Sequence, residues 1–118
     1  MTDIDCYLLR FDPNIQARLA FIRQTAGNVF DGAEEKLYHG HPSLFQNGRD
    51  FMNYGAYQHH ISICLGYEWV DLLKNLYPQY RYTKTTITFP HADPFPHDVV
   101  QTICDLLKQN LDFSKNQA

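Results

Sequence analysis

The sequence lacks the features that mark several common classes of protein. It has 10 Lys and Arg residues against 13 Asp and Glu residues, so it carries no basic excess for binding nucleic acid or an anionic membrane. No apolar run approaches the length of a membrane-spanning helix. The first residues also lack the basic and then apolar pattern of a signal peptide. We therefore expect a cytoplasmic protein that has neither nucleic acid nor a membrane as a partner.

Cysteine is scarce, and the common catalytic motifs are missing. The three cysteines, Cys6, Cys64 and Cys104, are far apart and odd in number, which fits neither a disulfide framework nor a zinc site. The sequence has no glycine-rich phosphate loop, no nucleophile elbow and no His-Glu-x-x-His motif. These observations favour a protein that is not an enzyme.

Apolar and aromatic residues, in contrast, are plentiful. The 118 residues are 44% hydrophobic and 14% aromatic, which is enough for one packed core and argues against disorder. We expect a single domain over residues 1–118, in which residues 114–118 form a flexible tail.

Three helices are predicted from apolar spacing and from end signals. Asp12 and Pro13 form a helix start, and apolar residues then recur every three or four positions as far as Val29. The same spacing predicts a helix over 67–76 and a last helix that begins at Pro96. Residues 1–11 predict an arm or short helix that packs on the body of the domain.

The segment 34–66 predicts a run of short antiparallel strands. Asn47-Gly48 is the strongest turn signal, because a type I′ hairpin turn needs positive φ at both central residues. A second turn is predicted at Gln58-His59 or His59-His60, and a further strand over 80–89. The expected fold is an α+β two-layer sandwich with an antiparallel sheet of about five strands. Its order is α, β meander, α, β, α, with a single core that contains Ile15, Leu19, Ile22, Ile63, Ile87, Phe89, Ile103 and Leu107.

Two pairs of histidines are candidate functional residues. His39 and His41 are two apart, so on one strand they would share a face and could bind a metal together. The alternative is that both are surface or turn residues beside Gly40 and Pro42. His59 and His60 are adjacent and fit a turn better than a strand.

A group of acidic residues precedes the first strand. Asp31, Glu34 and Glu35 offer carboxylate oxygens, which bind cations such as iron. The alternative is a solvated edge with no ligand.

Three segments resemble the bacterial YdhG-like family. They are Glu34–Phe45, with its paired glutamates and Gly-x-Pro; Ala56–Ile63, with His-Ile-Ser; and Lys84–Pro90 followed by Pro94-Phe95-Pro96. The resemblance implies a compact sandwich of helices on an antiparallel sheet. Most of the family is of unknown function, and some members are described as frataxin-like iron chaperones that supply iron for iron–sulfur cluster or haem assembly.

The resemblance implies weakly bound iron as the cofactor. Its ligands would be Asp31, Glu34 and Glu35, with His39 and His41 as additions, and the partners would be iron–sulfur assembly or haem-synthesis proteins. The alternative hypothesis is a small ligand- or protein-binding module without metal, which uses aromatic residues of the sheet. The residues expected to contact that ligand are Tyr38, Tyr57, His59 and His60. We expect a monomer or a weak homodimer.

Overall fold

The computed structural model describes the chain from residue 1 to residue 117, and its side chains from residue 1 to residue 111. The helices are α1 (Asp3–Leu8), α2 (Pro13–Val29), α3 (Tyr67–Leu76) and α4 (His97–Gln117). The strands are β1 (Glu34–Tyr38), β2 (His41–Gln46), β3 (Arg49–Ala56), β4 (His60–Cys64), β5 (Arg81–Tyr82) and β6 (Thr86–Pro90). No helix in the described part of the chain is long and apolar enough to cross a membrane.

The helix starts follow the signals in the sequence. The Asp12 side chain accepts a hydrogen bond from the Ile15 N–H and Pro13 is the first residue of α2, as predicted. α1 begins at a capping box, in which Thr2 and Asp5 bond each other's backbone N–H groups. The predicted arm at the N-terminus is therefore a short helix.

The strands form one antiparallel sheet in the order β1-β2-β3-β4-β6-β5. Asn47 and Gly48 have φ values of 54° and 78°, which confirms the predicted hairpin turn between β2 and β3. Gln58 and His59 make the next turn, where the Tyr57 N–H donates to the His60 carbonyl.

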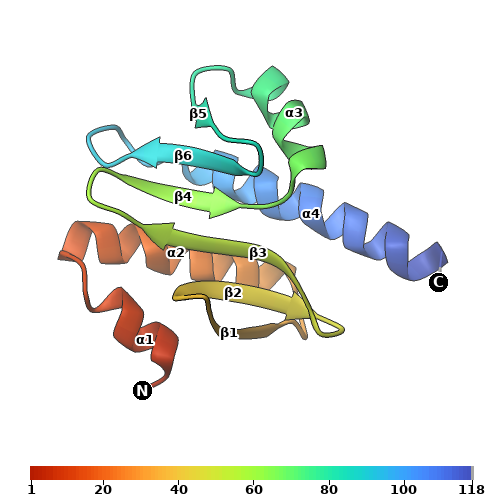
Figure 1. Cartoon of the computed structure of the whole chain (residues 1–118), viewed down its shortest axis with the longest axis horizontal. Helices are drawn as coiled ribbons and strands as arrows, with labels where there is room; N and C mark the ends of the chain where they lie inside the picture. The colour runs from red at the N-terminus through yellow and green to blue at the C-terminus, as the bar shows by residue number, and fades with distance from the viewer. Residues whose placement is uncertain (118) are drawn as a thin grey trace.

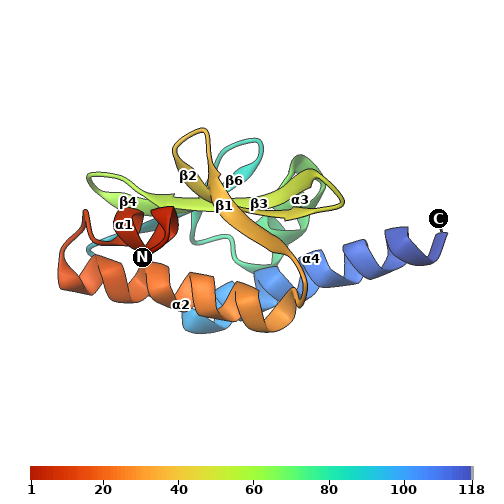
Figure 2. The same cartoon turned by 90° about the horizontal axis from the view of Figure 1, so that it is seen from below.

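The sheet and the two long helices make two layers. Figure 2 shows α2 and α4 side by side beneath one face of the sheet, while no helix of the described chain lies over the opposite face. Side chains alternate along β4, so Ile61 and Ile63 are buried toward the helices while Ser62 and Cys64 face the open side. All eight residues of the predicted core are buried in one cluster. The predicted α+β sandwich is confirmed.

The sheet has six strands rather than five. The predicted strand over 80–89 is divided into β5 and β6, joined by a turn in which the Thr83 N–H donates to the Thr86 carbonyl. Its Tyr and Thr residues favour strand conformation, but they do not show where a strand doubles back. The helix α4 continues through Gln117, and Ala118 lies outside the described backbone, so the flexible tail over 114–118 stays a prediction.

α4 extends past the sheet at its C-terminal end. In Figure 1 its last turns project beyond the end of β4, in the direction in which the β2–β3 hairpin also projects. A cavity lies between the start of β3 and the C-terminal half of α4.

Candidate functional site

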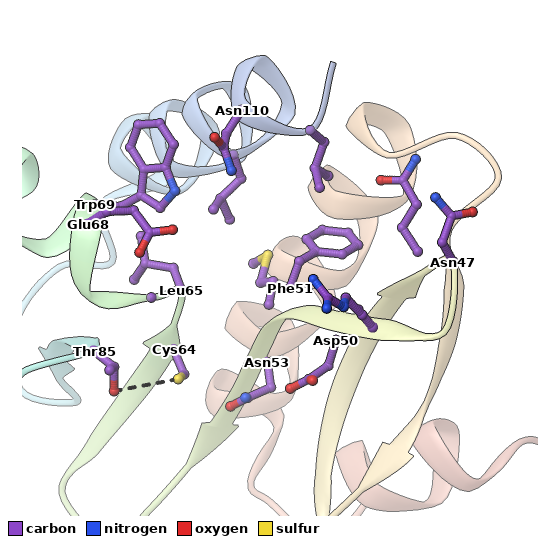
Figure 3. Close-up of a pocket in the computed structure, with 16 residues that line it drawn as sticks. Asn47, Asp50, Phe51, Asn53, Cys64, Leu65, Glu68, Trp69, Thr85 and Asn110 are labelled. Atoms are coloured by element: carbon purple, nitrogen blue, oxygen red, sulfur yellow. Dashed lines mark hydrogen bonds between the residues drawn. The ribbon is translucent and has the colours of Figure 1, made fainter. Parts of the chain in front are cut away.

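A cavity of about 640 Å³ lies at this end of the molecule (Figure 3). Its lining comes from the β2–β3 hairpin, the first half of β3, the end of β4, the start of α3 and the C-terminal part of α4. Four separate stretches of the sequence, within 46–53, 64–69 and 107–111 and at Thr85, thus meet around one space.

The cavity exists because β3 is longer than β4. β4 pairs with β3 only from Asn53 to Ala56, whereas β2 pairs with the other half of β3, from Arg49 to Asn53. After Cys64 the chain turns away, because Gly66 has φ of 103°, a conformation that side-chain-bearing residues avoid. The Leu65 N–H then donates to the Thr85 carbonyl, on the side away from β3. Residues 49–52 of β3 therefore border the cavity on the side where β4 does not continue.

A β-bulge sets which side chains face the cavity. Leu44 pairs with Met52 and Phe45 pairs with Asp50, so Phe51 is an extra residue on β3. A bulge re-aims the side chains around it. Here Phe51 lies on the helix side with Met52, and its ring packs edge-on against Phe30 with 4.8 Å between centroids.

The cavity has an apolar floor and a polar rim. Met52, Leu65 and Leu107 are buried on the floor. In Figure 3, Trp69 and Asn110 lie across the space from Phe51, and Glu68 points into it. Asp50 and Asn53 leave β3 on the other side, toward the open face of the sheet.

The polar groups of this cavity are suited to non-covalent binding. They include two carboxylates, the guanidinium of Arg49 and several side-chain amides. No ion pair is found for Asp50, Glu68 or Arg49 within residues 1–111, so their hydrogen-bonding capacity is open to a ligand. The Cys64 thiol lies 3.8 Å from the Thr85 hydroxyl.

The three predicted carboxylates do not form one ligand set in the structure. Glu34 and Glu35 are neighbours on β1, so their side chains point to opposite faces. A carboxylate oxygen of Glu35 lies 2.7 Å from Nε of Arg23, while Glu34 lies 3.5 Å from Nζ of Lys36. Asp31 is exposed in the turn before β1. Among the described residues, no three His, Cys, Asp or Glu side chains gather as a metal ligand group would.

The prediction that His39 and His41 share one face of a strand is wrong. His39 and Gly40 are the two central residues of the β1–β2 turn, with φ values of 52° and 80°. Only His41 belongs to a strand. The ring of His39 lies tilted against that of Tyr38 with 4.1 Å between centroids, whereas His41 lies beside Tyr57. The alternative interpretation of both residues as surface or turn histidines holds for His39 only, because His41 is a half-buried strand residue.

Tyr57 lies beside two of the candidate histidines, His41 and His60. Its ring stacks on His60 at 5.0 Å between centroids, and its hydroxyl lies 3.4 Å from Nε2 of His41. Partial burial lowers the pKa of His60, and the neighbouring His91, His59 and Arg81 lower it further. Tyr57 and His60 line a smaller hollow of about 380 Å³ on the open face, together with hydroxyl groups such as that of Ser62.

The remaining aromatic candidates do not form one surface. Tyr38 is 43% exposed and packs on Phe45 of the neighbouring strand β2. Tyr54, another tyrosine of the sheet, is only 1% exposed because it points toward the helices. His59 is an exposed turn residue, whose carbonyl accepts the His91 N–H.

The cavity residues were missed by sequence reasoning. Trp69 and Leu107 occur in helical stripes, and such stripes predict burial without showing where the packing is incomplete. The available signal was the mismatch between the strand after Asn47-Gly48, which has eight residues, and the next strand, which has five.

Comparisons with known proteins show a likeness of fold. No family model matches the sequence, and no curated protein matches it. Among solved structures, the fold is similar to the crystal structure of YdhG, a protein of the DUF1801 family from Bacillus subtilis, with a TM-score of 0.75. The two share 14% sequence identity, and the match covers 86% of this chain and 84% of that chain. The resemblance to the YdhG-like family is therefore supported at the level of the fold.

Proposed function

We propose that this chain is a binding module whose ligand occupies the cavity between β3, α3 and α4. The observation that carries this proposal is the combination of volume and lining. A space of about 640 Å³ falls within the range of ligand pockets, roughly 300–1,000 Å³. It also has the usual construction of such pockets, an apolar floor with a few polar groups at its rim.

Trp69 makes this proposal directly testable, because it is the sole tryptophan of the chain and lines the cavity. We would screen small aromatic amides by Trp69 fluorescence and by two-dimensional amide NMR. Saturable binding is expected, with shifts confined to the start of β3, the start of α3 and the end of α4. Asn110→Phe fills the rim of the cavity and should abolish binding.

Gln109→Phe is the matched control, since Gln109 is exposed on the same helix and does not line the cavity. It should bind like the wild type. Shifts scattered over the surface, or equal binding by both variants, would contradict the proposal.

Iron binding remains a second proposal. It is supported by the three motifs that resemble the YdhG-like family and by the exposure of Asp31 and Glu34 at one edge of the sheet. Such a frataxin-like chaperone would bind iron weakly and deliver it to iron–sulfur assembly or haem-synthesis proteins. An anaerobic calorimetric titration with ferrous iron tests it.

The double variant Glu34→Gln/Glu35→Gln should weaken ferrous binding, and His39→Ala/His41→Ala tests the added histidines. The structure gives a sharper control. Glu35→Gln alone breaks the ion pair with Arg23, so the loss of folding stability that it causes must be measured and distinguished from a loss of affinity for ferrous iron. No detectable heat in the wild type would leave the cavity as the functional site.

A further inference from the structure

The first half of β3 is a strand edge that lies inside the cavity. β2 occupies one side of residues 49–52, and β4 begins to pair only at Asn53. A strand edge presents main-chain N–H and C=O groups in a row, and these groups bind another extended chain readily. The cavity therefore offers main-chain hydrogen bonds in addition to its side chains.

This edge differs from the outer edge of the sheet. β1 is one of the two edge strands, on the side of β2, and it carries the charged side chains Glu34 and Lys36 and packs against α1. Charges of this kind discourage a second sheet from pairing. The free part of β3 is recessed instead, with Glu68 and Trp69 of α3 facing it and Leu107 of α4 below. A single extended segment fits such a place, whereas the flat edge of another sheet does not.

We propose that an extended peptide segment binds here as an added strand, in line with β4 and paired with residues 49–52. This inference rests on the proposed function of the cavity and names the class of its ligand. Four paired residues span about 13 Å at the usual rise of a strand. Alternate side chains of the peptide would enter the apolar floor formed by Met52, Leu65 and Leu107, and the others would face the open side.

Charge indicates which peptide fits. The lining carries the carboxylates of Asp50 and Glu68 against the one guanidinium of Arg49, and none of the three has an ion-pair partner within residues 1–111. Asp50 lies toward the open face, where the outward side chains of an added strand would be (Figure 3). The ligand is therefore a peptide that alternates apolar residues with basic ones.

The probe is a capped hexapeptide of alternating leucine and lysine, titrated against the full chain by Trp69 fluorescence and amide NMR. Binding should shift the amides of residues 49–52. Two N-methylated versions test strand pairing, because only alternate amides of a strand point to the same neighbour. Methylation of one alternate set should weaken binding by about fivefold or more, and methylation of the other set should not.

Charge is tested separately. A leucine and glutamate hexapeptide should bind several-fold more weakly, and Asp50→Asn should reduce the preference for lysine. Asp71→Asn is the matched control, since Asp71 is exposed on α3 outside the cavity. An absence of saturable peptide binding, or equal loss from both methylated sets, would overturn the inference. Aromatic amides that still bind would leave the proposed function standing, and failure of both probes would refute both.

Discussion

Replacing Tyr54 with Phe should stabilise this protein. Tyr54 is 1% exposed at the centre of the sheet, and its hydroxyl has no hydrogen-bond partner in the described part of the chain. Burying an unpaired hydroxyl costs roughly 1–3 kcal/mol, whereas the aromatic ring keeps its packing after the change to Phe. After allowing for the small space that the lost oxygen leaves, we expect a gain of about 1 kcal/mol in the free energy of unfolding.

Tyr82→Phe is the matched comparison, with the opposite sign. The Tyr82 hydroxyl lies 2.7 Å from the carbonyl of Tyr77 and 3.0 Å from that of Leu73, at the end of α3. Loss of this hydroxyl removes a satisfied hydrogen bond, which should cost about 1 kcal/mol. Urea unfolding followed by Trp69 fluorescence measures both variants, and unchanged m-values would show that the two unfolding reactions are comparable.

Alkaline pH gives an independent measurement on Tyr54. Burial raises its pKa in the folded state, so the neutral hydroxyl is retained in the fold after the unfolded chain has begun to ionise. Stability is then lost as the pH rises above about 10, the ordinary value for tyrosine. Tyr54→Phe should show a shallower loss than the wild type above that pH. A variant that is less stable than the wild type at neutral pH would refute the reasoning, because the hydroxyl would then have a bonding partner.

Three further predictions concern the fold. Leu19 is 0% exposed between α2 and the sheet, so Leu19→Ala should cost roughly 2–5 kcal/mol in chemical unfolding, and a cost below about half a kcal/mol would contradict its place in the core. Gly48 has φ of 78°, so Gly48→Val should cost about 1 kcal/mol or more, and an unchanged melting temperature would contradict the turn. Arg23 and Thr2 hold the pKa of Asp5 well below its usual range, so the contribution of Asp5 is present above pH about 4 and is lost as the pH falls below it. Asp5→Asn should therefore flatten the loss of melting temperature in acid, and an unaltered acid profile would show that Asp5 does not contribute.

The elements that the sequence predicted well have local signals. Asp12 and Pro13 start α2 through contacts within one turn, and Asn47-Gly48 fixes its own backbone conformation. The sequence does not predict the β1–β2 turn at His39-Gly40, although its two central residues also have positive φ. Histidine tolerates positive φ better than most residues, but His-Gly is a far weaker signal than Asn-Gly. The spacing of His39 and His41 then resembled a strand pattern.

The paired glutamates show the same limit for the candidate site. Adjacency in the sequence made Glu34 and Glu35 resemble a cluster, but a strand places neighbours on opposite faces. Glu35 forms an ion pair with Arg23 of α2, and the two side chains meet only because of the way in which α2 packs across the sheet. Only the tertiary structure reveals such a partner.

The cavity depends on differences between segments rather than on any one segment. The four residues 49–52 of β3 extend beyond its pairing with β4. Gly66 turns the chain away from β3 close to the point where this pairing stops. The bulge at Phe51 directs an aromatic ring toward the cavity. Each feature alone would leave an ordinary sheet edge exposed to solvent. Together with α4, which passes beneath, they enclose main-chain hydrogen-bonding groups beside an apolar floor. An unpaired strand edge is a liability in water, so its retention within a lined cavity supports a binding role for this end of the molecule.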